Sequence, residues 1–578
     1  MFRLDKRQNQ PRLFSDLDNL PRKQRERLEG SWAGTYRQQV HDRLDERPFC
    51  AIYEDVPSRP NYPVRVLLGF ETLKAGFGWS DEEAYDHVLF DLQVRYALGL
   101  DNLGEASFTL RTVYNFRHRV VQYMQTAGKD PVAEAFAQIT DEQIRSLALS
   151  TKQQRMDSTQ VSSNIRHMSR LQCMVEVLQR FHRALGGEDR ARYADALAPY
   201  IDETSGKFVH HLRGEDVTRH MQQIGELMQR LLAELATRYG QQEAYQMLQR
   251  VFGEQFNVVD GVVRAKAGKD ISPASLRSPD DPEATFRRKA GQTYEGYAAN
   301  VTETCDPDNP LQLVTKVQVE PNNTEDAQML LEALEELKER TELETLYTDA
   351  SFCSPDVDEA LREHHVEQVP TDLRGKQPNP EKLNLADFAV QRDAQGNPQQ
   401  VTCPGGQTVQ VQQGRKGHLY AACFAGDVCQ ACRHQDRCPA RLRKGDGKRS
   451  LRFDRYHLDI SERRRRSTAY WQAGQNLRSA VEATVGAIKR PFAEDQLPVR
   501  GRCRMAMLLL GSALMFNVRR IHRYLASQRT TAGPQTGQKD HQEVSSAHPA
   551  SLSCLLSTWI RSLLRPRTLT PAGFAFGC

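Results

Sequence analysis

The 578-residue sequence lacks the features that mark membrane and secreted proteins. No apolar run reaches the ~18 residues that a membrane-spanning helix needs. The longest candidate, at residues 505–518, contains Asn517 and is better explained as a buried helix. The N-terminus has no apolar signal-peptide segment, so we expect a cytoplasmic protein with no membrane partner.

A large net charge is also absent. The 78 basic and 74 acidic residues leave a formal charge of +4, which excludes a polybasic arm or an acidic solvating chain as the whole protein. Hydrophobic residues at 39% and charged residues at 26% are typical of a globular protein with a polar surface. The chain is long enough for several domains, each with a core of its own.

Three enzyme signatures are missing. There is no Gly-x4-Gly-Lys-Ser/Thr loop, so we expect no nucleotide cofactor, and neither a His-Glu-x2-His motif nor a dinucleotide-binding fingerprint is present. Disulfide bonds are not expected in the cytoplasm. Twelve cysteines are nevertheless present, and five of them fall between Cys403 and Cys438.

Residues 1–145 predict a helical domain. A first helix should start just after Pro63, and the sequence Ser80-Asp81-Glu82-Glu83 has the pattern of a capping box that starts a second. Ser107 is the expected cap of a third helix, which carries four basic side chains: Arg111, Arg117, His118 and Arg119. The pattern fits a DNA-binding domain, and a plain helical bundle is the alternative.

Residues 146–375 alternate between strand and helix patterns. We expect a strand at 152–161, a helical insertion at about 162–290, strands at 297–304 and 311–319, a helix at 324–340, a strand at 343–347 and a helix from Pro355. Without the insertion, this order predicts the first part of a ribonuclease-H-like α/β core.

The rest of the chain changes in composition twice. Residues 376–456 are rich in Gln, Gly, Pro and Arg and predict a β-rich, cysteine-containing insertion with too little apolar content for a core. Residues 457–528 predict the C-terminal helices of the catalytic core, beginning with one long helix at about 461–489. Residues 529–578 predict a disordered tail.

Two acidic residues lie at strand ends in this scheme. Asp157 ends the first predicted strand and Asp349 ends the fourth, and in a ribonuclease-H-like sheet these strands are neighbours. Mg²⁺ binds one or two carboxylates together with water and phosphate oxygens. Two such ions ~3.5–4 Å apart can activate a nucleophile and stabilise the leaving oxygen of a phosphodiester. The alternative for either Asp alone is a carboxylate that caps a turn.

A third carboxylate is expected on the long helix. At about 100° per residue, Glu482 lies ~40° and Lys489 ~20° from Arg478 around the helix axis. An acid between two bases on one face suits a metal ligand beside cations that hold phosphates. The alternative is a solvated face with ordinary ion pairs.

The motif Arg478-x3-Glu482-x6-Lys489, preceded by the two strand-end Asp residues, resembles the DDE transposases of bacterial insertion sequences. Many of these carry Tyr-x2-Arg-x3-Glu-x6-Lys, and here Gln475 stands at the Tyr position. The Asp-Pro-Glu-Ala sequence at 281–284 and the Gly-Tyr pair at 296–297 are also similar to this family. So is the segment at 70–119, which resembles the family's helical N-terminal domain.

The resemblance implies a function and its residues. Asp157, Asp349 and Glu482 would bind two Mg²⁺ or Mn²⁺ ions and catalyse cleavage at the element's ends, which frees a 3′-OH that attacks target DNA. Arg478 and Lys489 would hold DNA phosphates. Double-stranded DNA would be the partner, with a homo-oligomer assembled on it near the nucleoid. The rival functions are a metal-dependent nuclease that never joins strands and a catalytically inactive, DNA-binding repressor.

Two further clusters carry predictions. Cys403 with Cys429-x2-Cys432-x5-Cys438 resembles a structural four-thiolate Zn²⁺ site. Cys423 or His434 could replace one ligand, and reduced cysteines without metal are the alternative. The basic run Arg463, Arg464, Arg465 and Arg466 is expected to contact DNA phosphates, with a solvated face as the alternative.

Overall fold

The computed structural model describes residues 2–5, 15–54, 60–289, 291–371, 379–393, 396–414, 417–474, 477–492 and 496–531. The chain divides into two compact units, residues 1–527 and 528–578. Of the predicted tail, only residues 529–531 are described, and they end a helix. No helix in the described ranges is both long and apolar enough to cross a membrane.

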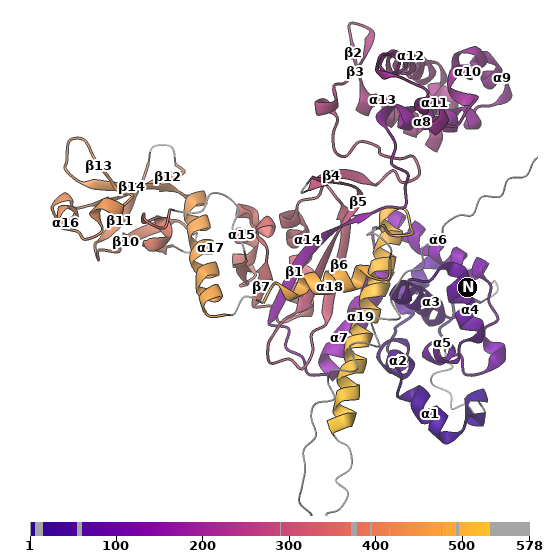
Figure 1. Cartoon of the computed structure of the whole chain (residues 1–578), viewed down its shortest axis with the longest axis horizontal. Coiled ribbons are helices and arrows are strands. Elements are labelled where there is room, and N and C mark those ends of the chain that lie inside the picture. The colour runs from indigo at the N-terminus through magenta and orange to yellow at the C-terminus, as the bar shows by residue number, and fades with distance from the viewer. Residues whose placement is uncertain are drawn as a thin grey trace, which may run out of the picture. The chain divides into compact units, whose positions relative to one another are not determined.

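The N-terminal part of the chain is helical (Figure 1). Its helices are α1 (Arg22–Glu29), α2 (Trp32–Tyr36), α3 (Val64–Phe77), α4 (Asp81–Phe90), α5 (Leu92–Ala97), α6 (Leu110–Ala127) and α7 (Pro131–Ser146). The predicted start after Pro63 and the capping box of Ser80 and Glu83 are both confirmed. The predicted cap of α6 is wrong: Thr109 is its N-cap residue, because Phe108 is buried and keeps the chain extended up to that point.

A mixed sheet forms the centre of the part of the chain that follows these helices. Its strands are β1 (Gln153–Ser162), β4 (Thr285–Lys289), β5 (Gln292–Thr304), β6 (Val314–Pro321), β7 (Thr345–Thr348) and β8 (Glu367–Pro370). The strand order β6-β5-β1-β7-β8, with only β5 antiparallel to its neighbours, is compatible with a ribonuclease-H-like core. Helices α14 (Asp326–Arg340) and α15 (Pro355–Glu363) follow β6 and β7. The extra strand β4 was not predicted, because it is a short polar strand that pairs only with β5.

Two insertions interrupt this core, and each has its own buried cluster. The first contains α8 (Arg170–Ala184), α9 (Gly187–Arg192), α10 (Ala194–Ile201), α11 (Ser205–His210), α12 (Gly214–Tyr239), α13 (Glu243–Gln255), β2 (Phe256–Val259) and β3 (Val262–Ala265). The second contains β9 (Ala389–Arg392), β10 (Pro398–Thr402), β11 (Thr408–Gln413), β12 (Leu419–Phe424), α16 (Gly426–Gln430), β13 (Arg441–Leu442) and β14 (Arg449–Asp454). The expectation that the second has no core is wrong, because its six-stranded sheet buries Phe388, Phe424 and Phe453.

The C-terminal helices are α17 (Arg455–Gln472), α18 (Ala480–Lys489) and α19 (Arg502–Thr531). The single long helix predicted at 461–489 is wrong. Gly474, with φ of +67°, follows α17 in the left-handed conformation that commonly ends helices. Gln475, the departure from the Tyr position of the motif, lies outside the described residues.

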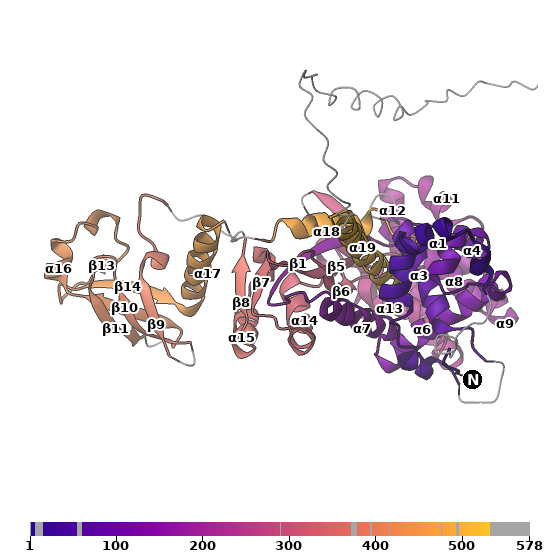
Figure 2. The same ribbon diagram turned by 90° about the horizontal axis from the view of Figure 1, so that it is seen from below.

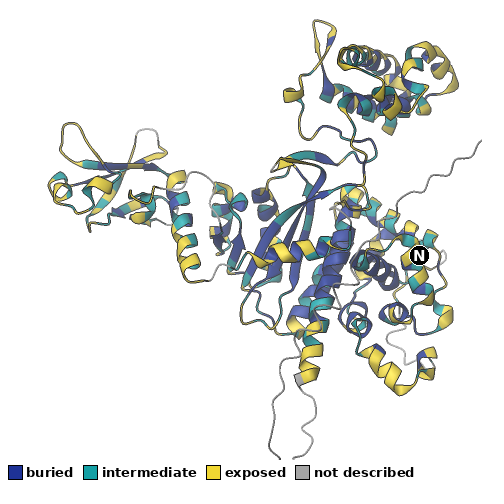
Figure 3. Cartoon of the chain, viewed as in Figure 1, coloured by how far each residue is buried: buried dark blue, intermediate teal, exposed yellow. Residues whose placement is uncertain are grey.

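Helix α19 joins the N-terminal helices to the sheet (Figures 1 and 2). One buried cluster contains residues of α3, α6, β5, β6 and α19, and the middle of α19, at residues 507–518, is buried (Figure 3). A Cβ on Gly76 of α3 would lie 2.3 Å from Cγ of Met515, so the two helices touch where a larger residue would not fit. The N-terminal helices therefore share their core with the mixed sheet.

Polar contacts also fasten α19 to the sheet. Asn517 is fully buried, accepts a hydrogen bond from the Val314 N–H at 2.8 Å and donates one to the Val314 carbonyl at 3.0 Å. At the start of the helix, the buried carboxylate of Asp281 accepts hydrogen bonds from the Tyr297 hydroxyl and the Gly501 N–H. The Asp-Pro-Glu-Ala sequence at 281–284 therefore holds the N-terminus of α19.

Candidate active site

Asp157 and Asp349 lie where two parallel strands separate. β1 pairs with β7 from Gln153 to Arg155, so Asp157 is two residues beyond the last parallel pair. Asp349 directly follows β7 and caps the short 3₁₀ turn η7 (Ala350–Phe352). The position predicted for Asp157 needs one correction: β1 does not end there but continues to Ser162, because β5 pairs with it along its whole length beyond Gln154.

Arg478 is the cation that the acidic residues share. Its guanidinium lies 3.0 Å from Oδ1 of Asp157 and 3.1 Å from Oε1 of Glu482. Burial opposes its charge, but the carboxylates of Asp157, Asp349 and Glu482 outweigh that effect and raise the pKa of Arg478. The structure thus brings the three predicted catalytic carboxylates around one positive group.

The carboxyl group of Asp157 is in an unusual electrostatic position. Burial raises the pKa of Asp157, Arg478 acts in the opposite direction, and the neighbouring charge of Asp349 raises that pKa further. Asp349 is held in place because its Oδ1 accepts hydrogen bonds from the backbone N–H and the hydroxyl of Ser351. Two acids that repel each other beside one base form a site with affinity for cations.

The segment that carries Arg478 and Glu482 departs from the prediction. Arg478 precedes α18 instead of lying on it, and Glu482 is in the helix's first turn. The side chain of Arg155, two residues before Asp157 on β1, holds this segment by donating to the carbonyl of Leu477 at 2.9 Å. The loop and the strand are therefore connected directly beside the acids.

A buried carboxylate that the sequence analysis missed anchors this connection. Glu303 on β5 is fully buried and lies 2.7 Å from Arg155 and 2.6 Å from Arg520 of α19. It also accepts a hydrogen bond from Thr484 of α18 at 2.8 Å. The four elements around the site therefore meet at one ion cluster. No signal in the sequence marked this pair, because β1 and β5 both contain many polar residues and 148 positions separate Arg155 from Glu303.

The chemistry of the site fits a divalent cation, although the side chains do not form a metal site as they stand. In the described ranges, no three His, Cys, Asp or Glu side chains are placed to hold an ion. Two of the carboxylates, Asp157 and Glu482, instead pair with the guanidinium of Arg478, and the charge of Asp349 also acts on it. Carboxylate oxygens are the ligands that Mg²⁺ and Mn²⁺ prefer.

The basic residues predicted to bind DNA phosphates differ in their exposure and in their partners. Lys489, the last residue of α18, donates to the Thr159 hydroxyl of β1 at 3.0 Å. Arg463 is buried and pairs with Asp358 of α15, so it fastens α17 and does not reach the surface. Of the predicted run of four arginines, Arg465 is exposed, and Arg464 and Arg466 are half-buried.

The predicted zinc ligands line one cavity. Cys403, Cys429, Cys432 and Cys438 all face a cavity of about 620 Å³ in the second insertion. A Cβ on Gly405 would lie 3.1 Å from Sγ of Cys432 and 3.6 Å from Sγ of Cys403, so a side chain there would fill the space between two thiols. Burial raises the pKa of Cys429, and the neighbouring thiols of Cys438 and Cys403 add to this effect.

The alternative ligands are separated by their positions. Cys423 does not line the cavity, and its Sγ lies 3.3 Å from Nη1 of Arg443. Side chains alternate along β12, so Cys423 points away from the core that holds Ala422 and Phe424. His434 does line the cavity.

Comparison with known proteins identifies the class. A family model described as a transposase DDE domain matches residues 402–522, about a fifth of the chain. The matched range contains Arg478, Glu482 and Lys489 but neither Asp157 nor Asp349. Searches of curated proteins and of solved structures found no match. The match defines a transposase-type, nucleic-acid-processing domain. Residues 402–522 are accordingly similar to the DDE domain of transposases, which bears out the resemblance at the level of this class.

Proposed function

We propose that this protein cleaves DNA at the ends of a bacterial insertion sequence and joins the freed ends to target DNA, using a ribonuclease-H-like core. The observation that carries the proposal is the arrangement of Asp157, Asp349 and Glu482 around the guanidinium of Arg478, where β1 and β7 separate. The transposase DDE match over residues 402–522 supports it. Because joining two DNA ends needs two active sites, we expect a homo-oligomer on DNA, near the nucleoid.

The chain's own residues would have distinct roles in the reaction. Asp157, Asp349 and Glu482 would hold two Mg²⁺ or Mn²⁺ ions, which supply activation of the attacking oxygen and stabilisation of the leaving oxygen when bound. Arg478, once released from the carboxylates, would hold a DNA phosphate, as would Lys489. Arg155 and Glu303 would keep Arg478 and Glu482 aligned with β1.

Two displacements at phosphorus make up the proposed reaction. In the first, a water oxygen forms a bond to phosphorus as the bond to the 3′ oxygen breaks; water loses a proton and the 3′ oxygen gains one. In the second, the freed 3′-OH attacks a target phosphodiester, and the target's own 3′ oxygen leaves. No covalent bond between protein and DNA is formed.

We predict that Asp157→Asn and Glu482→Gln each reduce strand cleavage about a thousand-fold, because each removes a metal ligand worth several kcal/mol in the transition state. The matched control is Glu344→Gln, because Glu344 stands at the opposite end of β7 and its side chain is 61% exposed, against 62% for Glu482. The assay uses a duplex that the full-length protein selects from a random pool, with Mg²⁺, and measures DNA binding in parallel.

The same assay separates the rival functions. Retained cleavage in either acidic variant would contradict the assignment of the site. A duplex with a pre-cut 3′-OH end tests joining: products that are only hydrolysed would identify a nuclease. A wild-type protein that binds DNA and neither cuts nor joins it would be the inactive repressor.

We also propose that Cys403, Cys429, Cys432 and Cys438 bind a structural Zn²⁺ ion. The four thiols line one cavity, and thiolates are preferred ligands of Zn²⁺. The ion would tie the loop at 403–407 to the segment at 426–438 across the small core of the insertion.

A further inference from the structure

Helix α6 has two faces of opposite character. Its inner face buries Val113, Phe116 and Val120 in the core shared with the mixed sheet. Arg117 also belongs to the protein interior, because its guanidinium pairs with Glu71 at 2.6 Å and with Asp81 at 2.5 Å. This arginine is therefore used within the fold and is not available to a partner.

The outer face carries a polar stripe. At about 100° per residue, five side chains fall within an arc of ~80° on the side opposite the buried residues. All five are exposed: Arg111, Asn115, His118, Gln122 and Gln125. Within the described part of the chain, none of these side chains has a hydrogen-bond or ion-pair partner. The helix thus presents a row of unused guanidinium, amide and imidazole groups.

The charge of α6 points to an anionic partner. Its 18 residues contain no Asp or Glu. Among the described helices of ten or more residues, only α19 shares this property, and α19 is buried along its middle, at residues 507–518. A solvated surface helix normally mixes both signs of charge, so the absence of acids is a specific feature of this face.

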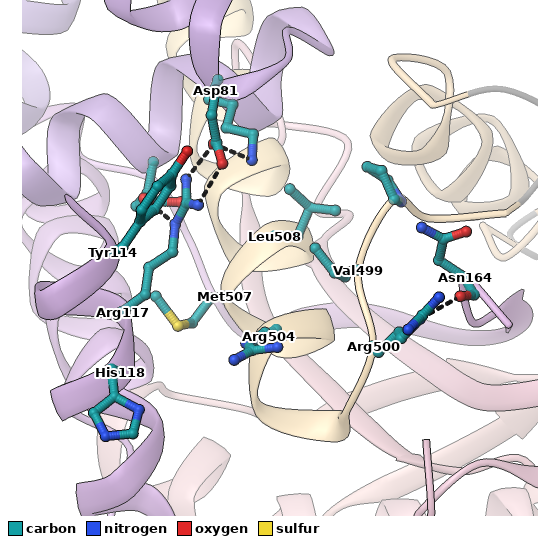
Figure 4. A pocket seen from close by; sticks show the side chains of 13 residues that line it. Asp81, Tyr114, Arg117, His118, Asn164, Val499, Arg500, Arg504, Met507 and Leu508 are labelled. Atoms are coloured by element: carbon teal, nitrogen blue, oxygen red, sulfur yellow. Dashed lines mark hydrogen bonds and ion pairs between the residues drawn. The ribbon is translucent and has the colours of Figure 1, made fainter. Parts of the chain in front are cut away.

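Two cavities border the stripe, and each is lined in part by arginine side chains. On one side, His118 lines a cavity of about 390 Å³ together with Arg500, which precedes α19, and Arg504 in the first turn of that helix (Figure 4). Arg504 has no hydrogen-bond or ion-pair partner in the described ranges. On the other side, Asn115 lines a cavity of about 600 Å³ together with Arg119.

This arrangement matches the shape and chemistry of a DNA major groove. A helix with its side chains is ~10–12 Å wide, and the major groove is ~12 Å wide. Guanidinium and amide groups form paired hydrogen bonds with guanine and adenine edges. From Arg111 to Gln125 the stripe is ~21 Å long, about six base pairs. Arg504 and Arg119 line the cavities on the two sides of α6, and phosphate backbones would flank the helix on these two sides if it lay in the groove.

We propose that α6 reads DNA sequence by inserting its outer stripe into the major groove of double-stranded DNA. The inference rests on the proposed function for the identity of the partner. It goes further in naming the helix, the groove and the side chains that select the sequence. Arg111 and Asn115 are the main base contacts, and Arg504 binds a phosphate beside them.

The test selects duplexes from a random pool with the full-length protein, in buffer without added Mg²⁺ so that the DNA stays intact. The wild type should enrich one motif. Asn115→Ala and Arg111→Ala should each bind the selected duplex about 5- to 150-fold more weakly and lose preference at one or two positions. Affinity of Asn115→Ala for an unselected duplex should be unchanged. Arg219→Ala is the charge-matched control, because Arg219 lies exposed on α12 of the first insertion.

The outcomes distinguish this inference from the proposed function. Stripe variants that select the same motif with unchanged affinity would overturn the role of α6, whatever the catalytic variants do. A wild type that binds duplexes without enriching any motif would also overturn it and leave the proposed catalysis standing. A wild type that binds no duplex would overturn both. Because the stripe is exposed, its variants should unfold at the wild-type temperature, which excludes a folding defect as the cause.

Discussion

At the scale of single residues, Arg478 has two uses that exclude each other. In the protein without metal or DNA, its guanidinium offsets the negative charge of Asp157, Asp349 and Glu482. The same three carboxylates are the proposed metal ligands. In the proposed reaction, a divalent ion would compete with the guanidinium for these carboxylates, and the released guanidinium would then bind a phosphate. This explains why an arginine four residues before a catalytic Glu is useful: it keeps buried acids paired until metal and DNA arrive.

The cysteine cavity supplies the residue-scale prediction. We expect Cys432→Ser to lose the bound Zn²⁺, of which the wild type should hold about one per chain, because a hydroxyl is a poor replacement for a thiolate in a four-thiolate site. Cys423→Ser is the matched control and should keep the metal, since Cys423 lies outside the cavity beside Arg443. Metal content is measured after purification without chelator.

Two results would contradict the zinc assignment. Wild-type protein without zinc would leave the four cysteines as free thiols. Zinc lost from the Cys423 variant but kept by the Cys432 variant would mean that the ligand set is a different one.

At the scale of elements, the position of α19 decides how the other parts are held. One face packs against α3, another against the sheet, and Arg520 reaches Glu303 beside the active site. Its N-terminus is held by Asp281, which lies far from it in the sequence. A shift of α19 would therefore move α18 and Glu482 relative to Asp157.

Asn517 provides the element-scale prediction. Asn517→Leu keeps a similar volume but leaves the buried N–H and carbonyl of Val314 without partners. We expect it to lower the free energy of unfolding by about 2–4 kcal/mol. Leu514→Met, also buried on α19, is the control and should cost less than about 1.5 kcal/mol. Denaturant unfolding followed by circular dichroism measures both, and equal midpoints would contradict the role of Asn517.

At the scale of the whole molecule, the net charge of +4 hides a division of charge. Exposed basic side chains occur on the stripe of α6, at Arg504 near the start of α19 and at Arg465 of α17, and others lie on α1 and in the second insertion. The acids near the active site face one internal guanidinium. Overall charge is therefore a poor guide to whether this protein binds a polyanion.

This division leads to a prediction about salt. We expect the affinity for duplex DNA to fall about a thousand-fold between about 50 and 200 mM salt, as for proteins that contact several phosphates. Arg465→Ala should reduce the slope of log affinity against log salt by about one, because one phosphate contact is lost. Arg219→Ala should leave the slope unchanged. A flat salt response in the wild type would contradict binding through phosphates.

The sequence by itself determined most of the elements and the three acidic positions. Starts at Pro63 and Ser80 depend on local backbone chemistry, and apolar periodicity depends on neighbours along one helix or strand, so both can be recognised without a structure. The helical spacing from Arg478 to Lys489 failed in part, because Arg478 precedes α18 and only Glu482 and Lys489 lie on that helix.

Only the tertiary structure decided how those parts cooperate. Arg155, Glu303 and Arg520 are far apart in sequence, and nothing local indicates that they meet. Arg463 was expected to contact DNA, but it is buried and forms an ion pair with Asp358 that links α17 to α15. Burial also separated Arg117, which is paired inside the fold, from Arg111 on the open stripe. Which charge is free for a partner depends on long-range packing, and that is a property of the folded chain.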